Sequence, residues 1–401
     1  MAIEYFWRLP THGDGRKAHD KHTRGEWNNT APHLRVAPRV RNGVRDPFTY
    51  IDYLSQVARA AEISGFDGAL VPTGTVSEQS WIVAAALARE TRALRFMVAH
   101  QPAYTEPHFA AQMAATLQRI TGNRVDLNII TGGDSGAQRK IGDFLDHDQR
   151  YARTSEFLEV LRNYWTRAPH SFQGDFYRLE EGGLSAPLKD APVPGIYFAG
   201  SSEPAIAAAA QHADVYLMWA EPLAGNREMI ERVSAAAAAA GRGDRLRFGI
   251  RVDIIARETE EEAWREARQL FDTATAETRQ RSSTAVGLVA GKVNTESEGA
   301  KRQWALHKGN SQDFDSLIVG PNLWAGMSFL RGGPACGLIG SYAQIADRLA
   351  EYVAIGATSF ILASNPHLEE AYRIGEEVLP LMDEAIARQG GQAAALRRSA
   401  A

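Results

Sequence analysis

The sequence predicts a (β/α)8 TIM barrel, the α/β fold in which eight parallel strands alternate with helices and close on themselves. Eight apolar stretches have the length and composition of strands, and helical patterns lie between most of them, as in repeated parallel βαβ units. With 401 residues, the chain is long enough for one large α/β domain with insertions, or for two domains. A doubly wound sheet is the main alternative, but no predicted strand is followed by a GxGxxG turn.

The predicted strands are short apolar runs, often β-branched, that turn-forming residues bound. In chain order they are Ile3–Leu9, Gly68–Val71, Leu94–Ala99, Val125–Ile130, Gly195–Ala199, Val215–Trp219, Phe248–Ile255 and Ser359–Ala363. The predicted helices carry apolar residues at helical spacing. They are Tyr53–Ser64, Trp81–Arg89, Ala110–Ile120, Ser155–Trp165, Pro204–His212, Arg227–Ala240, Glu260–Phe271, Tyr342–Gly356 and Leu368–Arg388.

Three connections are longer than ordinary loops, namely residues 11–49, 169–194 and 272–340. In a barrel, insertions that follow strands lie over the C-terminal face, where ligands bind. We therefore expect one barrel domain over residues 1–389 that carries these insertions. A tail over residues 390–401 is expected to begin flexibly, and either an oligomerisation arm or fraying would account for it.

Composition narrows the class of protein. The net charge of −4 gives no sign of a nucleic-acid partner or a polybasic membrane surface. The single cysteine, Cys336, excludes an intramolecular disulfide and a multi-thiolate metal site, and favours the reducing cytoplasm. The N-terminus lacks a signal-peptide pattern, and the longest apolar run, Trp81–Ala88, is too short to span a bilayer. A soluble cytoplasmic protein is expected.

The stretch from Val125 to Tyr151 is the centre of the functional prediction. Its strand ends in a Thr-Gly-Gly corner, where the backbone can approach a ligand closely. Asp126 and Asn128 interrupt the apolar run, and polar atoms in a buried strand need partners. An ordinary βα unit with a glycine-rich turn is the alternative interpretation.

Two other strands end in polar groups. Gly200-Ser201-Ser202 precedes a predicted helix, for which Ser202 is a plausible N-cap, so capping alone would explain the motif. Arg251 lies in an otherwise apolar strand and needs an anionic partner, since burying it unpaired is costly. That partner is either a ligand or an acid such as Asp253. The sequence Asp146-His147-Asp148 does not indicate a metal site, because no further ligands accompany it.

Ten sequence blocks, in order from end to end, resemble the FMN-dependent alkanesulfonate monooxygenases of the bacterial-luciferase-like group. They are FWRLPTHGDG at 6–15, VPTG at 71–74, AAQMAATL at 110–117, NIITGGD at 128–134, FLDHDQRY at 144–151, YFAGSS at 197–202, RFGIR at 247–251, PNLWAG at 321–326, LRGG at 330–333 and PHLEEAYR at 366–373. The resemblance implies a (β/α)8 barrel that takes reduced FMN from a separate NAD(P)H-dependent flavin reductase and uses it with O2. A flavin–oxygen adduct then attacks the sulfonate, sulfite leaves and an aldehyde remains. A homo-oligomer, dimer or tetramer, is also implied.

The resemblance assigns a cofactor site. Gly200, Ser201 and Ser202 would hold the FMN phosphate at a helix N-terminus, where free N–H groups and the helix dipole favour a dianion. Tyr151 matches a phosphate-contacting tyrosine, although a core aromatic is the alternative. Thr131 matches a flavin contact at a strand end, against a turn-forming threonine, and Asn128 is a neighbour of the flavin.

The resemblance also assigns reacting and substrate-binding residues. His12 follows the first strand and Trp219 ends the sixth, where it would form a pocket wall near flavin and sulfonate. Arg251 would contact the sulfonate or the flavin–oxygen adduct, because its planar fork suits an oxyanion. Arg331 would lie on a mobile lid that closes over the flavin. The alternatives are a surface or hydrogen-bonded histidine at His12, a core tryptophan at Trp219, a salt bridge to an acid at Arg251 and a solvated loop charge at Arg331. His367 either lines the pocket or caps the next helix.

Three positions depart from the family pattern. Ser77 replaces a pocket cysteine, Asp253 replaces a histidine, and Asn365 replaces a tyrosine. These changes put the usual acid–base assignment in doubt and leave Asp253 and His12 as candidates for proton transfer. They also replace aromatic bulk with hydrogen-bonding groups, which suits a substrate with several hydroxyls, such as the sulfosugar sulfoquinovose.

Other functions fit the same motifs. A broad alkanesulfonate monooxygenase would keep the chemistry, and an FMNH2-dependent enzyme acting on a sulfone, an amine chelator or an aldehyde would keep the cofactor. A flavin- or sulfonate-binding protein without turnover belongs to a different class. A deazaflavin-dependent dehydrogenase on the same barrel is disfavoured by the paired serines.

Overall fold

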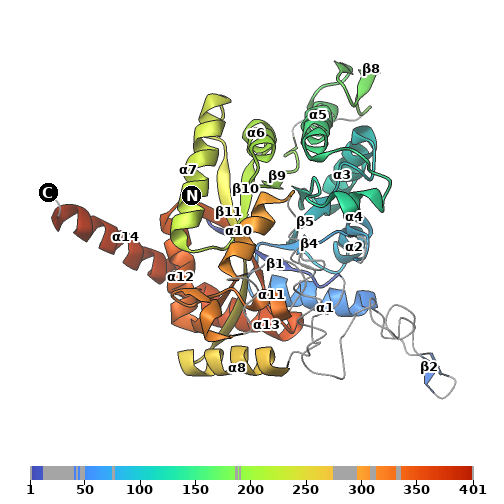
Figure 1. The fold of residues 1–401 in the computed structure, drawn as a ribbon. Coiled ribbons are helices and arrows are strands. Elements are labelled where there is room, and N and C mark those ends of the chain that lie inside the picture. Colours follow the sequence, from blue (N-terminus) through green and yellow to red (C-terminus); the bar gives the residue numbers. More distant parts are fainter. Residues whose placement is uncertain are drawn as a thin grey trace.

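A closed barrel of parallel strands forms the centre of the molecule (Figure 1). The structure is a computed structural model that describes residues 2–11, 40–41, 44–45, 50–74, 77–185, 188, 191–273, 296–307, 313–330 and 336–399. Within these residues, eight parallel strands pair in the order β10-β9-β6-β5-β4-β1-β15-β11, and pairing of β10 with β11 closes the ring. The (β/α)8 fold class predicted from the sequence is therefore confirmed.

Every barrel strand begins and ends within two residues of its predicted position. The strands are β1 Glu4–Arg8, β4 Gly68–Val71, β5 Arg95–His100, β6 Val125–Ile129, β9 Ile196–Ala199, β10 Val215–Trp219, β11 Arg247–Arg257 and β15 Ala357–Ala363. Because successive strands are parallel, their carboxyl ends meet at one mouth of the barrel. Polar residues that the sequence separates by more than 100 positions are thereby brought to the same face.

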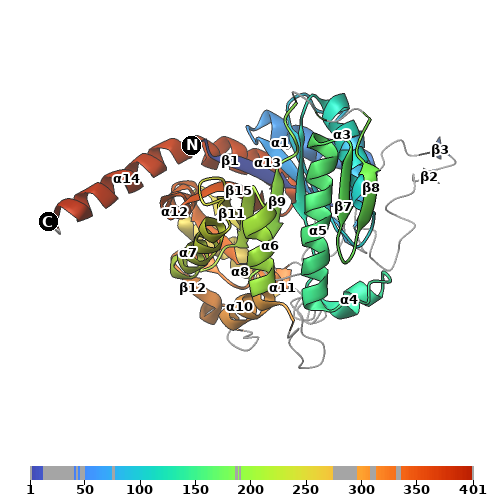
Figure 2. The same ribbon diagram turned by 90° about the horizontal axis from the view of Figure 1, so that it is seen from above.

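The larger helices flank the barrel, and short helices occupy the connections (Figures 1 and 2). The helices that follow barrel strands are α1 Tyr50–Ile63, α2 Ser80–Leu87, α3 Pro107–Thr121, α4 Ser135–Arg139, α5 His147–Thr166, α6 Glu203–His212, α7 Leu223–Ala239, α8 Glu260–Thr273 and α13 His367–Arg373. The others are α10 Glu298–Leu306, η3 Asp315–Leu317, α11 Met327–Leu330, α12 Tyr342–Ala354, the π-helical η4 Ile374–Val378, η5 Leu379–Leu381 and α14 Met382–Ser399. Side-chain caps define several starts, such as the capping boxes of Asp146 and Gln149 on α5 and of Ser341 and Gln344 on α12.

The long insertion at 272–340 is more structured than expected. It contains α10, η3, α11 and three strands, β12 Ile318–Gly320, β13 Leu323–Trp324 and β14 Gly337–Ser341. The barrel strand β11 is long enough to pair with β15 along its first half and, in parallel, with β14 through Asp253–Arg257. The strand β14 escaped prediction because its sequence, GLIGS, offers only two large apolar residues.

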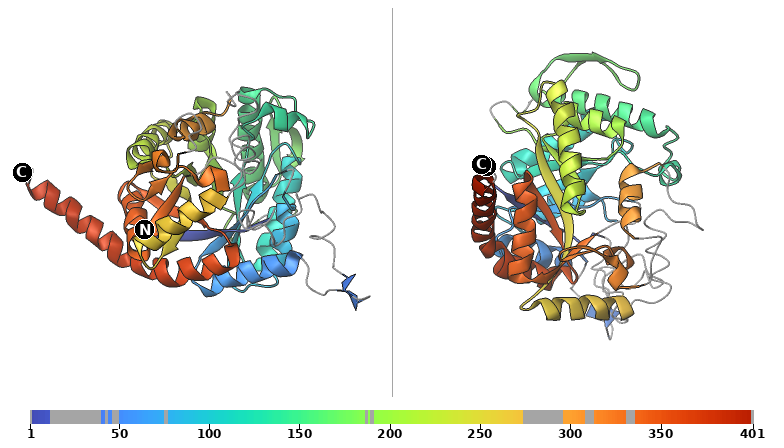
Figure 3. Two further views of the ribbon diagram at one scale, coloured as in Figure 1. Left: turned by 60° about the horizontal axis from the view of Figure 1, so that its bottom comes forward. Right: turned by 60° about the vertical axis from the view of Figure 1, so that its left-hand side comes forward.

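Two other expected irregular segments contain regular structure. The connection 169–194 forms a hairpin of β7 His170–Gln173 and β8 Arg178–Gly182, which lies beside α5 in Figure 2. In the first insertion the described backbone forms a small hairpin of β2 Val40–Arg41 and β3 Val44–Arg45. The boundary expected at Gly390 falls inside α14, which continues to Ser399 and extends away from the body of the molecule (Figure 3, left).

The core has two layers. One apolar cluster fills the barrel interior with alternate strand residues, including Phe6, Met97 and Ile361. A larger cluster lies between the strands and the surrounding helices.

A polar network closes the interior at the amino ends of the strands, where Glu4 pairs with Arg95 at 2.6 Å and with Arg247 at 2.8 Å. Asp126 also pairs with Arg95, and the Tyr197 hydroxyl donates to Glu4. The buried Asp126 that needed a partner is thus satisfied at the end of the barrel opposite the candidate site.

Candidate active site

A cavity of about 280 Å³ opens at the carboxyl ends of the barrel strands. Its walls come from the ends of β6, β9 and β10, from β11, and from the first turns of α5, α7 and α10. Eight of the residues predicted to bind cofactor or substrate line it together: Asn128, Thr131, Tyr151, Gly200, Ser201, Ser202, Trp219 and Arg251. The barrel therefore assembles in one place the residues that sequence reasoning had selected from five separate segments.

The β6 end contributes an amide and a strained corner. Asn128 is 8% exposed, and its Oδ1 has no hydrogen-bond partner within the described chain. Thr131 is buried and donates to the hydroxyl of Thr154 at 3.2 Å. Gly132 has φ +91°, and a Cβ there would lie 2.3 Å from Gln138 Nε2, so this corner requires glycine.

The β9 end forms the turn expected to hold a phosphate. Gly200 has φ +145°, and a Cβ there would lie 2.8 Å from the Tyr151 hydroxyl, so glycine lets the turn approach Tyr151. Ser202 is the N-cap of α6 but makes no side-chain capping bond, and its Oγ is buried beside the Tyr151 phenol, whose pKa burial raises and Ser202 lowers, without a contact of full hydrogen-bond geometry among the described residues. Helix capping by the side chain therefore does not explain Ser202. Burial raises the pKa of the Tyr151 phenol, which stays a neutral donor.

The β10 end carries Trp219 and Glu221. Asn226, on the first turn of α7, accepts from the backbone N–H of Glu221 at 2.9 Å and donates to the carbonyl of Trp219 at 3.0 Å. Asn226 is 2% exposed and thus fixes the backbone on which Trp219 is mounted. Glu221 and Asn226 were not predicted as site residues, although their position just after a strand end was a signal that could have identified them.

Arg251 projects into the cavity from β11. Its Nη1 donates to Asp253 Oδ2 at 3.0 Å, while its Nη2 is buried with no hydrogen-bond partner in the described part of the chain. Asp253 is 1% exposed and does not line the cavity. One terminal nitrogen of a fixed guanidinium is thus left for an oxyanion.

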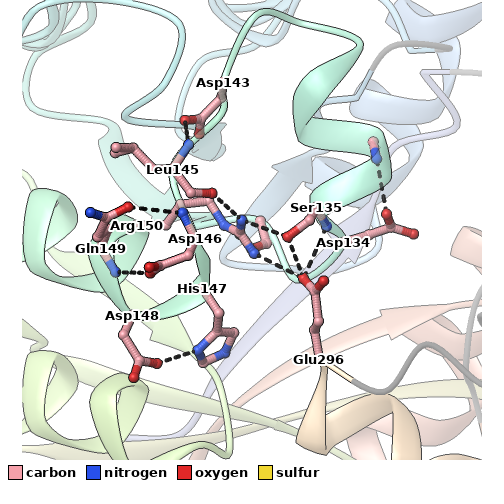
Figure 4. Close-up of polar contacts among 12 residues, drawn as sticks. Asp134, Ser135, Asp143, Leu145, Asp146, His147, Asp148, Gln149, Arg150 and Glu296 are labelled. Atoms are coloured by element: carbon pink, nitrogen blue, oxygen red, sulfur yellow. Dashed lines mark hydrogen bonds and ion pairs between the residues drawn. The ribbon is translucent and has the colours of Figure 1, made fainter.

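Arg150 organises the rim of the cavity (Figure 4). Its side chain is fully buried and donates to the carbonyls of Gly132 and Leu145 and to the hydroxyl of Ser135. Glu296, just before α10, accepts from Arg150 and from Ser135. In the same view Asp146 caps α5 and Asp148 bonds to the His147 ring, so this acidic cluster has local structural partners.

The helix α10 forms a wall that the sequence did not predict. Ser297, Glu298, Gly299 and Arg302 line the cavity. Arg302 donates to Glu221 through Nε at 3.2 Å and through Nη2 at 2.6 Å. These residues belong to the 272–340 insertion, and the available signal was the Ser-x-x-Ala start of a helical run inside it.

The remaining predicted residues are not among the described residues that line the cavity. His12 and Arg331 fall outside the described residues. Ser77, Asn365 and His367 do not line the cavity. His367 is the first residue of α13, after the N-cap Pro366, and it is buried with its ring near that of Trp7.

The orphaned polar atoms test whether the cavity suits a phosphorylated flavin. Asn128 Oδ1, Ser202 Oγ and Arg251 Nη2 are buried around one space without contacts of full hydrogen-bond geometry in the described chain, and such atoms are costly unless a ligand satisfies them. The Ser201-Ser202 turn presents the first N–H groups of α6 beside Tyr151. These donors fit the phosphate of FMN, while the apolar side chains of Leu70, Ile361 and Met229 fit its ring system.

The described residues contain neither a metal-binding cluster nor a membrane-spanning helix. No three His, Cys, Asp or Glu side chains gather there in a way that could hold a metal ion. None of the helices described has both the length and the hydrophobicity that a bilayer crossing requires.

The fold and the cavity define a TIM-barrel protein with a mostly apolar cavity that carries a few polar groups at the C-terminal mouth. Comparison with known proteins identifies the family, because residues 12–359 match the luciferase-like monooxygenases. The chain belongs to this family and is a flavin-dependent monooxygenase.

Solved structures share the fold at low sequence identity. A riboflavin lyase (RcaE) with modified FMN and riboflavin has a TM-score of 0.69 and 18% identity, over 96% of this chain and 92% of the other. The EDTA monooxygenase EmoA from Chelativorans sp. BNC1 has a TM-score of 0.68 and 17% identity, over 96% and 94%. The long-chain alkane monooxygenase LadA has a TM-score of 0.69 and 17% identity, over 96% and 92%.

Proposed function

We propose that this protein is the oxygenase of a two-component system that desulfonates an organosulfonate, releasing sulfite and an aldehyde. It would take FMNH2 from a separate NAD(P)H-dependent flavin reductase and use O2 as the oxidant. The observation that carries the proposal is Arg251, which lines the cavity and whose buried Nη2 has no hydrogen-bond partner in the described chain. An anionic substrate group satisfies that nitrogen, and a sulfonate matches the fork of a guanidinium.

The cofactor end of the cavity is assigned to Gly200, Ser201, Ser202 and Tyr151, which would hold the FMN phosphate. Thr131 and Asn128 would contact the flavin ring from β6. When bound, reduced FMN supplies the electrons with which O2 is activated.

The substrate end is assigned to Arg251 and Trp219. Asp253 holds Nη1 of Arg251, so the guanidinium keeps one orientation while its other terminal nitrogen binds the sulfonate. Trp219 forms an apolar wall that excludes water beside the reacting carbon. His12 and Arg331, which lie outside the described residues, are retained as proposed active-site and lid residues. Asp253 and His12 are the candidates for proton transfer.

A polar substrate is favoured over a bare alkyl chain. The positions that depart from the family pattern, Ser77, Asp253 and Asn365, all carry hydrogen-bonding groups. Asn365 Oδ1 is buried without a hydrogen-bond partner in the described chain, and it follows β15 at the same end of the barrel as the cavity. Although Ser77, Asn365 and His367 do not line the cavity, we propose that they support its substrate side. Sulfoquinovose, which would give 6-oxo-glucose, is the leading candidate.

Alkanesulfonates of broad range are one alternative class of substrate. In a second alternative the enzyme still uses FMNH2, but its substrate carries a different anionic group. One structural neighbour is an EDTA monooxygenase, and carboxylates of an amine chelator would also satisfy Arg251 Nη2. A sulfone would leave Arg251 without an anionic ligand.

We further propose that the protein is a homo-oligomer located in the cytoplasm. The cytoplasm is proposed because the chain has a single cysteine and that cysteine is buried.

The decisive experiment is a sulfite-release assay with FMN, a flavin reductase, NADH and O2 over a panel of sulfonates. Sulfoquinovose should give sulfite and 6-oxo-glucose faster than simple alkanesulfonates do. Turnover of simple alkanesulfonates without turnover of the sulfosugar would overturn the substrate assignment. Oxygen uptake with a chelator, without sulfite release from any sulfonate, would indicate that the anionic group of the substrate is a carboxylate.

A further inference from the structure

The start of α10 lies between two strand ends that the cofactor site uses. The side chain of Ser297 lies 3.4 Å from where a Cβ of Gly133 would be, at the corner after β6. Two residues further on, Gly299 faces the turn after β9 and the end of β10. Ser297, Glu298 and Gly299 line the cavity together with Ser201 and Ser202.

Gly299 leaves very little room at this contact. A Cβ at this position would lie 3.2 Å from Cζ3 of Trp219 and 3.6 Å from Oγ of Ser201. Any side chain larger than a methyl group must therefore move Trp219 or occupy the space beside Ser201. The absence of a side chain at residue 299 keeps that space open.

An ion pair holds the N-terminal end of α10 in place. Glu296 Oε2 accepts from Arg150 Nη2 at 3.4 Å and from the backbone N–H of Ser135 at 3.2 Å, as well as from the Ser135 hydroxyl (Figure 4). The other partners of Arg150 are neutral oxygens, so Glu296 brings a carboxylate to a fully buried guanidinium. The hydrogen bond from Ser135 lowers the pKa of Glu296, which therefore stays ionised at neutral pH.

The side of α10 is anchored to the end of β10. Arg302 makes two hydrogen bonds to the carboxylate of Glu221 and a third to the carbonyl of Gly225. Gln303 is fully buried and donates to the carbonyl of Ala220 at 3.3 Å. With attachments at Glu296 and at Arg302 and Gln303, α10 has one defined position over the mouth of the barrel.

We propose that the first turn of α10 closes the phosphate end of the flavin site, that Gly299 determines how much room the phosphate has, and that Glu296 positions this wall. The inference rests on the proposed FMN site at Ser201 and Ser202, and it adds a third segment to that site. Glu296 is a positioning residue in this arrangement, since it acts through Arg150 and Ser135.

The test compares the affinities for oxidised FMN and for riboflavin, which lacks the phosphate, measured by quenching of flavin fluorescence. Gly299→Leu should weaken FMN binding at least about tenfold and riboflavin binding less, because the added side chain meets Ser201 beside the phosphate as well as Trp219. Gly299→Ala should have a smaller effect of the same kind. Glu296→Gln should lower the FMN-to-riboflavin affinity ratio, whereas Glu180→Gln, in an exposed pair with Arg178 on β8, should leave it unchanged.

Each outcome decides the inference. Equal losses for both flavins in Gly299→Leu would place α10 at the ring end and overturn it. Unchanged affinities in Gly299→Leu and Gly299→Ala, with FMN binding by the wild type, would overturn it while the proposed function stands. If the wild type binds neither flavin, the proposed function fails and this inference fails with it. Gly299→Ala guards against misfolding, because alanine is favoured over glycine within a helix.

Discussion

Arg251 and Asp253 form an ion pair on one face of β11 that uses only one end of the guanidinium. The two residues are two positions apart in a strand, so their side chains point to the same side. Nη1 of Arg251 lies 3.0 Å from Oδ2 of Asp253, and Nη2 is buried without a partner in the described chain. A salt bridge and a ligand contact, which the sequence offered as alternatives, are therefore compatible in this geometry.

Replacing Arg251 by alanine should abolish desulfonation and spare the cofactor. Loss of a buried charged contact costs about 2–5 kcal/mol, so sulfite release should fall thirty-fold or more, with the dissociation constant of FMN nearly unchanged. Steady-state sulfite release and flavin titration measure the two effects. Arg178→Ala, at an exposed arginine on β8, is the matched control. Weaker FMN binding in Arg251→Ala would move this residue to the phosphate site.

Asp253→Ala should destabilise the fold, because it leaves Arg251 buried without the carboxylate that pairs with it. Removing one partner of a buried pair typically costs roughly 3–5 kcal/mol. The double variant Arg251→Met/Asp253→Ala should cost less than the sum of its single variants, because no uncompensated charge remains. Urea unfolding at neutral pH gives the three free energies. Strict additivity would show that the two side chains do not interact.

Ser202→Ala should separate cofactor binding from stability. The side chain makes no capping bond to α6, so the free energy of unfolding should change by less than about 0.5 kcal/mol. A hydrogen bond to a charged phosphate contributes about 1.5–3 kcal/mol, so FMN affinity should fall roughly tenfold or more. Thermal unfolding and flavin titration test the two statements. A large drop in melting temperature would show that Ser202 has a structural role.

Acidification should weaken the barrel through Glu4. Burial opposes ionisation of this carboxyl, but hydrogen bonds and charges from Arg95 and Arg247 bring its pKa below the ordinary value of 4.5. A depressed folded-state pKa means that the stabilisation is complete above the unfolded pKa and is lost as the pH falls through the folded value.

Glu4→Gln should therefore lower stability by about 1–3 kcal/mol at pH 7 and flatten the loss of stability below about pH 4.5. Urea unfolding from pH 7 to pH 3 measures both. Tyr5→Phe changes the neighbouring residue of β1 without removing a carboxylate, so its acid profile should match the wild type. An unchanged acid profile for Glu4→Gln would assign the loss of stability to other groups.

The barrel and many of the residues that line the cavity could be predicted from the sequence alone. Each strand had a local apolar signature, and the parallel order follows from alternation with helices, so Thr131, Ser202 and Trp219 could be placed at one mouth without coordinates. The same reasoning could not assign different roles to Asp126 and Asn128. Both point inward from β6, but only the tertiary structure shows Asp126 satisfied by Arg95 and Asn128 facing the cavity.

The wall made by α10 was decided by tertiary structure. No helix was predicted near residue 300 from the sequence, and a helical pattern there would not say where the helix docks. Its position depends on Glu296 meeting Arg150 and on Arg302 meeting Glu221, across separations of 146 and 81 residues. Strand and helix periodicity is a property of neighbouring residues and is therefore readable from sequence, whereas a pairing of charges over such distances exists only once the barrel has brought the segments together.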